Sequence, residues 1–114
     1  MALPLVYMTV QWKVTPGEAR PITEALHALM VAARAEHGYV NCSLSTELGE
    51  SAKLCYREEW QTEDDLQRQI HTTRFAKVAE LIERASQEPR VQFHLPGVVR
   101  GLDYAEELLG RDRK

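Results

Sequence analysis

The stretch LVYMTVQWKVTPGE, residues 5–18, contains the change of periodicity that decides the fold. From Leu5 to Val14 apolar and polar side chains alternate, and β-branched and aromatic residues are frequent, so this run predicts a strand with one buried face. The residues TPG then end the strand, and Thr15 followed by Glu18 has the spacing of a helix capping box. We therefore expect a strand that passes directly into a helix.

The following segments also alternate between the spacing of apolar residues typical of a helix and that typical of a strand. Apolar residues at helical spacing from Ala19 to Ala33 predict an amphipathic helix, and Gly38 has the position of a C-cap glycine. Two further strands are predicted over Tyr39–Glu47 and Lys53–Trp60, joined by the turn sequence LGES. A helix thus separates the first strand from a hairpin.

The second half of the chain repeats the helix and strand pattern. A helical region is expected to begin at Thr62, and the pair Thr72-Thr73 is a candidate break or cap within it. A fourth strand is predicted over 91–95, and residues 102–109 predict a short helix.

The predicted order is βαββαβ followed by a C-terminal extension, which is the ferredoxin-like pattern. It predicts an α+β fold with a four-stranded antiparallel sheet and both helices on one face. The 114 residues fit one domain. We expect that domain to span 1–114, with its core at about 4–96 and a C-terminal arm and short helix over 97–110.

Composition excludes several classes of function. The 14 Lys and Arg against 17 Asp and Glu give a net charge of −3, whereas a nucleic-acid-binding domain with a broad basic face would be strongly basic. No apolar run approaches the ~20 residues of a membrane span, and the N-terminus lacks the basic region of a signal peptide. We therefore expect a cytoplasmic protein with neither nucleic acid nor membrane as a partner.

One face of the predicted sheet is left open, because both helices pack on the other face. Such a face is either solvated or packed against a second copy in an isologous dimer. The residue pattern alone leaves both alternatives open. The expected residues of this open face are Tyr7, Thr9, Gln11, Asn41, Ser43, Ser45, Arg57 and Glu59.

The hairpin register decides the fate of the two cysteines. The apolar residues of the two strands face each other only if the residue numbers of each directly opposite pair add up to an even number. The numbers of Cys42 and Cys55 add up to an odd number, so the two cysteines are not directly opposite. The thiols are therefore predicted to lie on opposite faces of the sheet without forming a disulfide, unless a β-bulge shifts the count.

Familiar motifs for metals and cofactors are missing from the sequence. It contains no glycine-rich phosphate loop and no GxSxG nucleophile elbow. His27 and His37 are ten positions apart, which does not direct both side chains to one metal ion. We expect no metal site and no cofactor.

Residues capable of chemistry gather around the third strand and the helix that follows it. Tyr56, Glu58 and Trp60 share the strand face that points toward the helices. A carboxylate on that face must be paired or hydrogen-bonded, and Arg74 or a helix N-terminus is the expected partner. A structural role is the alternative, with Trp60 as a core anchor, Glu58 as a hydrogen-bonding group and His71 as a solvated helix residue.

Over nearly its whole length the chain resembles the antibiotic biosynthesis monooxygenase (ABM) domain family. The resemblance is carried by the Glu58-x-Trp60 motif at the end of the third strand and by Phe75 in an amphipathic helix. The run EPRVQF at 88–93, followed by GLDY at 101–104, is similar to one subgroup of that family.

The resemblance implies a dimeric α+β barrel, in which two open sheet faces pack together to form a homodimer. It also implies a pocket between sheet and helices, beside Trp60. Characterised members of the family oxidise phenols, quinols or polycyclic aromatics with O₂ and without flavin or metal. One branch of the family binds and degrades heme.

Several positions depart from the family pattern. Gln69 stands where many members have a histidine, and His71 would point about 200° further round the helix. Tyr56 stands where some oxygenases have asparagine, and the first strand lacks the asparagine of heme-degrading members. These departures weaken the case for a heme ligand in this chain.

The leading hypothesis is a cofactor-independent monooxygenase that oxidises a small hydroxylated aromatic or quinol with O₂. Arg74 would stabilise the phenolate electrostatically, and His71 or Glu58 would be the base. The expected substrate-binding residues are Tyr56, Trp60, Gln69 and Phe75.

Two alternatives accompany this hypothesis. A non-catalytic dimer of the same fold would bind a small aromatic ligand, or would stabilise a partner enzyme, and needs no proton-transfer group. Binding and degradation of heme through His71 is the third reading.

Overall fold

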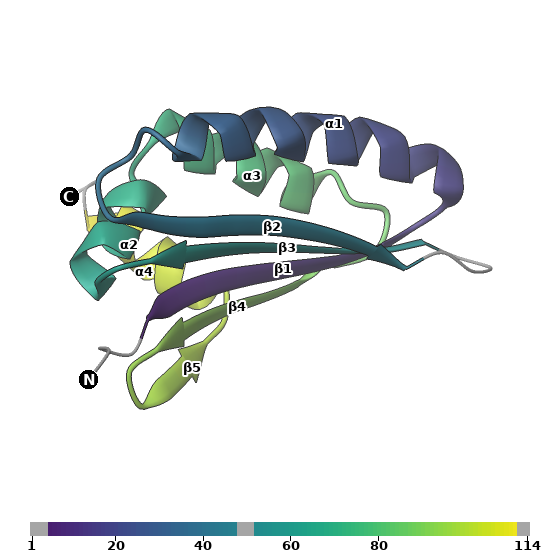
Figure 1. The fold of residues 1–114 in the computed structure, drawn as a ribbon. Coiled ribbons are helices and arrows are strands. Elements are labelled where there is room, and N and C mark those ends of the chain that lie inside the picture. Colours follow the sequence, from purple (N-terminus) through teal and green to yellow (C-terminus); the bar gives the residue numbers. More distant parts are fainter. Residues whose placement is uncertain (1–4, 48–51, 112–114) are drawn as a thin grey trace.

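The computed structural model describes residues 5–47 and 52–111 of the chain (Figure 1). Its helices and strands follow the predicted order, with one strand more and one helical region divided in two. In chain order they are β1 (Val6–Val14), α1 (Pro16–Ala33), β2 (Tyr39–Glu47), β3 (Ala52–Trp60), α2 (Glu63–Ile70), α3 (Thr73–Glu83), β4 (Arg90–Leu95), β5 (Val98–Arg100) and α4 (Asp103–Arg111).

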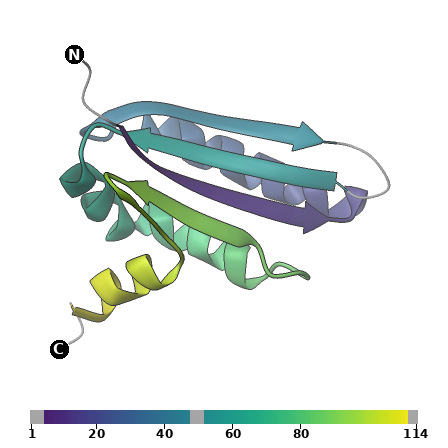
Figure 2. The same ribbon diagram turned by 90° about the horizontal axis from the view of Figure 1, so that it is seen from below.

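The sheet has five strands in the order β2-β3-β1-β4-β5, and every neighbouring pair is antiparallel (Figure 2). The expectation of four strands was therefore wrong. β5 follows a tight turn in which Gly97 has a φ of 78°, and it pairs with β4 through only three residues, Val98 to Arg100. A strand this short is below the length at which alternation can be recognised in a sequence.

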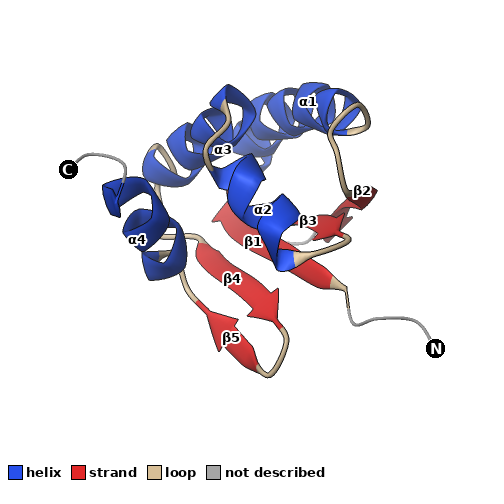
Figure 3. Ribbon diagram, turned by 90° about the vertical axis from the view of Figure 1, so that its left-hand side faces the viewer, coloured by secondary structure: helices blue, strands red, loops and turns tan. Residues whose placement is uncertain are grey.

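The helices cover one face of the sheet, and the other face is open, as expected (Figures 1 and 3). α1 and α3 lie along the covered face, whereas α2 and α4 lie together near one end of the sheet. The structure confirms the α+β fold class. In the described part of the chain no helix is both long and apolar enough to cross a membrane.

Threonine caps start three of the helices. Thr15 and Glu18 form the predicted capping box, in which the Thr15 hydroxyl accepts from the Glu18 amide and the Glu18 carboxylate accepts from the Thr15 amide. Thr62 caps α2, and Thr72 caps α3 by accepting from the Phe75 amide at 3.1 Å. The candidate break at the Thr72-Thr73 pair is therefore a real boundary between two helices.

Gly38 has a different role from the predicted one. α1 ends at Ala33 and is capped by Arg34, four residues before Gly38. Gly38 has a φ of 82°, and a Cβ atom there would lie 2.2 Å from the Cγ of Asp65. Glycine is required at this position because the loop after α1 runs directly against the first turn of α2.

The hairpin register agrees with the prediction. Leu44 pairs with Tyr56 and Cys42 pairs with Glu58, so the apolar sets of β2 and β3 share a face. Cys42 and Cys55 consequently lie on opposite faces of the sheet, and both are free thiols. The turn sequence LGES falls outside the described residues.

A bulge interrupts the start of β2. The register shifts between Tyr39 and Asn41, which makes Val40 the extra residue of the strand. Val40 is consequently 40% exposed, and Tyr39 meets the ring of Trp60 edge-on.

The core lies between the sheet and the helices. Within it, the indole Nε1 of Trp12 donates a hydrogen bond to the backbone oxygen of Leu81 at 3.3 Å, which connects β1 to α3. The largest fully buried side chains are Trp12, Trp60, Tyr56, Phe93, Met8, Leu26, Leu54 and Leu66.

Candidate functional site

A buried ion pair forms the centre of the candidate site. Glu58 on β3 is 2% exposed and Arg74 on α3 is 7% exposed. The two guanidinium nitrogens Nη1 and Nη2 of Arg74 donate to the two carboxylate oxygens of Glu58, at 2.5 and 3.0 Å. Burial opposes the charge of Arg74, but hydrogen bonds to Glu58 and its negative charge outweigh that effect and raise the pKa of Arg74. Arg74 therefore supplies a permanent cation in the interior.

Tyr56 lies beside this pair on the same strand face. Its hydroxyl donates a hydrogen bond to Oε2 of Glu58, the oxygen that also accepts from Arg74. Burial, together with the neighbouring Glu58 charge, raises the pKa of Tyr56 well above its usual value. The Tyr56 phenol is consequently a neutral donor at physiological pH.

Cys42 extends the cluster across the hairpin. Its Sγ lies 4.0 Å from the hydroxyl oxygen of Tyr56. Burial and the charge of Glu58 raise the pKa of the Cys42 thiol to about 11. The thiol is thus neutral near pH 7 and lacks the thiolate character that a reactive cysteine needs.

Gln69 holds Arg74 from the other side. Its side-chain oxygen accepts from Nη2 of Arg74 at 2.9 Å, and its amide nitrogen donates to Oε2 of Glu36 at 3.2 Å. Gln69 belongs to α2, and Glu36 to the loop between α1 and β2. The guanidinium group is therefore positioned by residues from separate parts of the fold.

Two buried donors of the site have no acceptor. Trp60 is fully buried, and its indole Nε1 has no hydrogen-bond partner among the described residues; the same is true of Nε of Arg74. The Cζ atom of Arg74 lies 5.6 Å from the centre of the Trp60 ring. Leaving a buried donor unsatisfied costs about 1–3 kcal/mol, so both groups require an explanation.

The structure brings together most of the residues that the sequence singled out. Tyr56, Glu58, Gln69 and Arg74 form one hydrogen-bonded cluster, and Trp60 lies against it. The pairing of Glu58 with Arg74 was one of the two alternatives left open. Glu36 and Cys42 also belong to the cluster but were not predicted. The even hairpin register places Cys42 opposite Glu58, whereas no sequence pattern points to Glu36.

Two expected site residues lie elsewhere. His71 is exposed at the C-cap of α2, where its Nδ1 lies 2.9 Å from the backbone oxygen of Gln67. Phe75 is buried, and it lines a cleft between α3 and α4. Neither residue belongs to the hydrogen-bonded cluster of Glu58 and Arg74.

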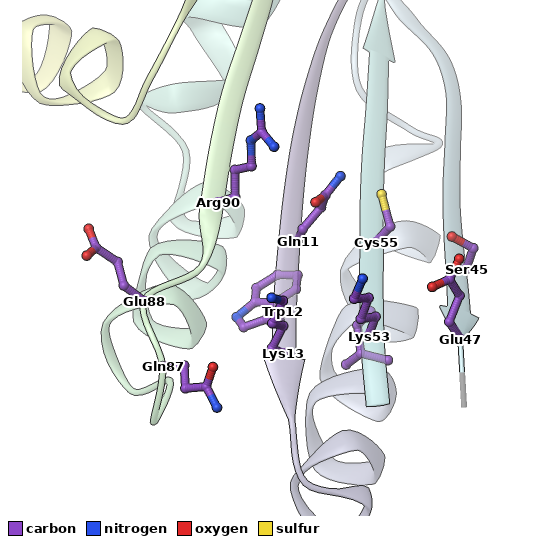
Figure 4. Close-up of a pocket in the computed structure, with 11 residues that line it drawn as sticks. Gln11, Trp12, Lys13, Ser45, Glu47, Lys53, Cys55, Gln87, Glu88 and Arg90 are labelled. Carbon is purple, nitrogen blue, oxygen red and sulfur yellow. The ribbon is translucent and has the colours of Figure 1, made fainter. Parts of the chain in front are cut away.

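The open face of the sheet contains a separate cleft with a volume of about 600 Å³ (Figure 4). Lys13 and Lys53 lie directly opposite each other on β1 and β3, and Arg90 lines the same cleft. None of these three side chains has an ion-pair partner within residues 5–47 and 52–111. Like charges at directly opposite positions destabilise a sheet. Glu47 lies opposite Lys53 on β2, and Glu47 and Glu88 line the same cleft, so carboxylates near the two lysines offset part of this repulsion.

Further along the open face, three side chains form a stack. The guanidinium carbon of Arg57 lies 3.7 Å from the centre of the Tyr7 ring, and the Tyr7 and His94 rings are stacked with centroids 4.1 Å apart. Burial and the charge of Arg57 lower the pKa of His94. Within the described residues no group of three or more His, Cys, Asp or Glu side chains is arranged to hold a metal ion.

Comparison with known proteins gives similarity in structure only. No protein-family model matches the sequence, and no curated protein matches it. A conserved protein from Methanosarcina mazei Go1 superposes with a TM-score of 0.70 at 18% identity, covering 82% of this chain and 94% of that protein. A putative antibiotic biosynthesis monooxygenase from Deinococcus radiodurans gives 0.69 at 13% identity, covering 82% and 93%. The chain shares the fold of these proteins.

A second ABM-type structure agrees with this result. The putative antibiotic biosynthesis monooxygenase from Nitrosomonas europaea has a TM-score of 0.66 at 12% identity and covers 85% of this chain and 88% of that protein. These matches confirm the α+β fold of the single chain. In this chain the space between the sheet and the helices of the ABM fold holds the Glu58 and Arg74 cluster.

Proposed function

We propose that this protein is a cofactor-independent monooxygenase that oxidises a small hydroxylated aromatic or quinol with O₂. The observation that carries the proposal is the two buried N–H donors that have no acceptor among the described residues, Nε1 of Trp60 and Nε of Arg74. A ligand oxyanion that accepts from either donor would satisfy a buried polar group near a permanent cation. A phenolate has this oxyanion and an aromatic ring that can pack on Trp60.

In the proposed reaction the substrate itself supplies the electrons. The phenol loses a proton, and the resulting anion transfers one electron to O₂. The two radicals combine at a ring carbon to give a hydroperoxide, which loses water to leave a carbonyl group. O₂ accepts four electrons in total: one oxygen atom enters the carbonyl group and the other leaves in water, together with two hydrogen atoms of the substrate.

We assign Glu58 rather than His71 as the proton acceptor. The Glu58 carboxylate already accepts a hydrogen bond from the Tyr56 hydroxyl, so Tyr56 can relay a proton. Tyr56 gives its hydroxyl proton to Glu58 and takes the proton of the substrate in its place. His71 lies outside the cluster, at an exposed helix end. Gln69 is a positioning residue, because it holds the guanidinium group of Arg74.

The test is oxygen uptake by the metal-free and flavin-free protein with a panel of quinols and hydroxylated polycyclic aromatics, corrected for autoxidation. Trp60→Phe keeps the aromatic ring but removes the indole donor, and Arg74→Lys keeps the charge but removes Nε. Each is expected to lower kcat about a hundredfold, the usual effect of losing one oxyanion donor. His71→Gln is the matched control and is expected to leave the rate unchanged.

The control also separates the two candidate bases. If His71→Gln abolished uptake while Trp60→Phe did not, the assigned roles would be wrong. Uptake at the autoxidation rate with every substrate would reject oxygenase activity on this class of compounds.

A second candidate function is a non-catalytic module that binds a small aromatic ligand. It is favoured by one feature of the cluster: Glu58 and Gln69 already occupy the Nη groups of Arg74, so much of the guanidinium charge is compensated within the protein. Binding of the same aromatics without oxygen uptake would support this function and reject the first.

We also propose that the protein is a homodimer in which two open sheet faces pack together. Lys13 and Lys53 support this arrangement: neither has an ion-pair partner among the described residues, and carboxylates of a second copy could pair with them. Sheet packing would further bury the Tyr7 and His94 stack.

A further inference from the structure

A second cleft, of about 240 Å³, lies between α3 and α4 and is remote from the open face of the sheet. One face of each helix forms its walls. The residues that line it are Phe75, Ala79, Ile82 and Glu83 from α3, and Leu102, Ala105, Glu106, Leu109 and Gly110 from α4 and the residue before it.

The cleft exists because α4 is attached to α2 rather than to α3. The hydroxyl of Tyr104 donates to Oε2 of Glu63 at 2.9 Å, and the side-chain amide of Gln67 donates to the Tyr104 hydroxyl oxygen at 3.1 Å. These bonds hold α4 against α2. The short side chains Ala79 and Ala105 then leave the space between α3 and α4 unfilled.

Two carboxylates stand at this otherwise apolar cleft, one from each wall. Glu83 and Glu106 are both exposed, and neither side chain has an ion pair or a hydrogen bond in the part of the chain that the structure describes. Phe75, Ile82 and Leu109 provide the apolar surface between them. Opposite walls therefore present negative charge above an apolar floor.

We propose that this cleft binds a small hydrophobic cation, namely an amine with one or two rings. The rings would cover the surface of Phe75, Ile82 and Leu109, and the ammonium group would lie between Glu83 and Glu106. The volume of about 240 Å³ is just below the range of drug-sized pockets, which start at roughly 300 Å³, so the ligand is limited to one or two rings.

This second site has the opposite charge preference to the Arg74 cluster, and it does not depend on the proposed oxygenase activity. The cluster presents unsatisfied donors to an anion, whereas the α3–α4 cleft presents to a cation two carboxylates that have no partner among the described residues. One molecule cannot satisfy both sites well. The cation is therefore expected to be an additional ligand and not the phenolic substrate.

The experiment compares three probes that share a naphthalene ring: 2-naphthylmethylamine, neutral 2-naphthylmethanol and anionic 2-naphthoate. We expect the amine to bind most tightly by titration calorimetry, with amide NMR shifts at Ala79, Glu83 and Ala105. Glu83→Gln and Glu106→Gln should each weaken amine binding about threefold and together about tenfold, as exposed ion pairs allow. Salt at about 0.5 M should weaken it similarly.

Two further variants make the result decisive. Ala79→Phe places a ring in the cleft and should abolish binding of the amine, while Glu80→Gln removes an exposed charge of α3 outside the cleft and should change nothing. Equal binding of amine and alcohol, or unchanged affinity in the double glutamine variant, would overturn the proposal. Shifts confined to residues around Arg74, or no binding of the amine at millimolar concentration, would overturn it as well.

Discussion

Glu58 and Arg74 are 16 positions apart in the sequence and are joined in the interior by two hydrogen bonds. Each is compensated mainly by the other, with Tyr56 and Gln69 completing the hydrogen bonds. Buried pairs of this kind contribute little net stability, because desolvation cancels most of their attraction. Replacing only one of the two charged side chains is costly, because the other charge then stays buried without a partner in a medium of low polarity.

This asymmetry predicts the behaviour of variants at the pair. Glu58→Gln leaves the Arg74 charge without its partner and should lower the free energy of unfolding by about 3–5 kcal/mol. The double variant Glu58→Leu with Arg74→Met should recover most of that loss. The measurement is urea denaturation of each variant.

The exposed pair of Arg20 and Glu24 on α1 supplies the control. Its nitrogen and oxygen atoms are 3.1 Å apart, but both side chains are largely in solvent, so Glu24→Gln should cost at most about 0.5 kcal/mol. Equal losses for Glu58→Gln and Glu24→Gln would contradict a buried and mutually dependent pair.

His94 predicts a dependence of stability on pH. Burial and the nearby charge of Arg57 lower the pKa of His94 in the folded protein, so the unfolded chain binds its proton more readily. The contribution of neutral His94 to the free energy of unfolding is therefore complete above the pKa of histidine in the unfolded chain, about 6.5. It is lost as the pH falls from there through the lower pKa of His94 in the folded protein. Melting temperatures between about pH 7.5 and pH 5 should fall more steeply for the wild type than for His94→Gln.

Parallel slopes for the two proteins would show that His94 does not contribute. The variant keeps a polar side chain beside Tyr7, and for that reason its stability at the upper end of the pH range should change little.

At the scale of elements, the junction between α1, β2 and α2 holds the candidate site in place. The loop after α1 carries Glu36, which binds Gln69, and Gly38, whose carbonyl oxygen accepts from the amide of Gln61 at 2.9 Å. The side chain of Asp65 fills the space that a Cβ at Gly38 would need. α2 is thereby fixed at the distance from which Gln69 reaches Arg74.

Gly38→Ala tests this close approach, and Gly97→Ala is its matched control. Both glycines have a positive φ, 82° and 78°, but a Cβ at Gly97 has no atom within 4 Å. Gly97→Ala should therefore cost only the backbone strain of about 1–2 kcal/mol, and Gly38→Ala should cost clearly more. Thermal unfolding measures the difference, and equal losses would argue against a tight junction.

At the scale of the whole molecule, the open sheet face is the largest feature without a covering layer. Most of its residues are polar, Lys13 and Lys53 have no ion-pair partner in the described part of the chain, and Tyr7 is held between Arg57 and His94. The proposed homodimer would cover this face. Within the chain, Thr9 occupies its middle, where it pairs with Arg57 on β3 and Gln92 on β4.

Thr9→Arg should therefore convert the proposed dimer into a monomer, because it adds a charge next to Arg57 where two sheets would meet. Sedimentation velocity measures the change. The same substitution at Val31, which is 65% exposed on α1, is the control and should leave the dimer intact. A wild-type monomer would reject the dimer, and a dimer that survives Thr9→Arg would place the interface elsewhere.

The sequence by itself determined the βαββαβ order and the orientation of the strands' faces, but not the short strand β5. Alternation in β1, the capping box at Thr15 and the even register of Leu44 with Tyr56 are encoded within short stretches, because strand and helix periods depend on neighbouring residues. The same local rules placed Tyr56, Glu58 and Trp60 on one face of β3.

Only the tertiary structure decided which side chains meet at the candidate site. The rotation of α2 brought Gln69 to Arg74 and left His71 exposed, and the loop after α1 supplied Glu36. The attachment of α4 to α2 through Tyr104 likewise created the α3–α4 cleft. These contacts join segments far apart in the chain, and their geometry depends on how the helices pack on the sheet, which no local period encodes.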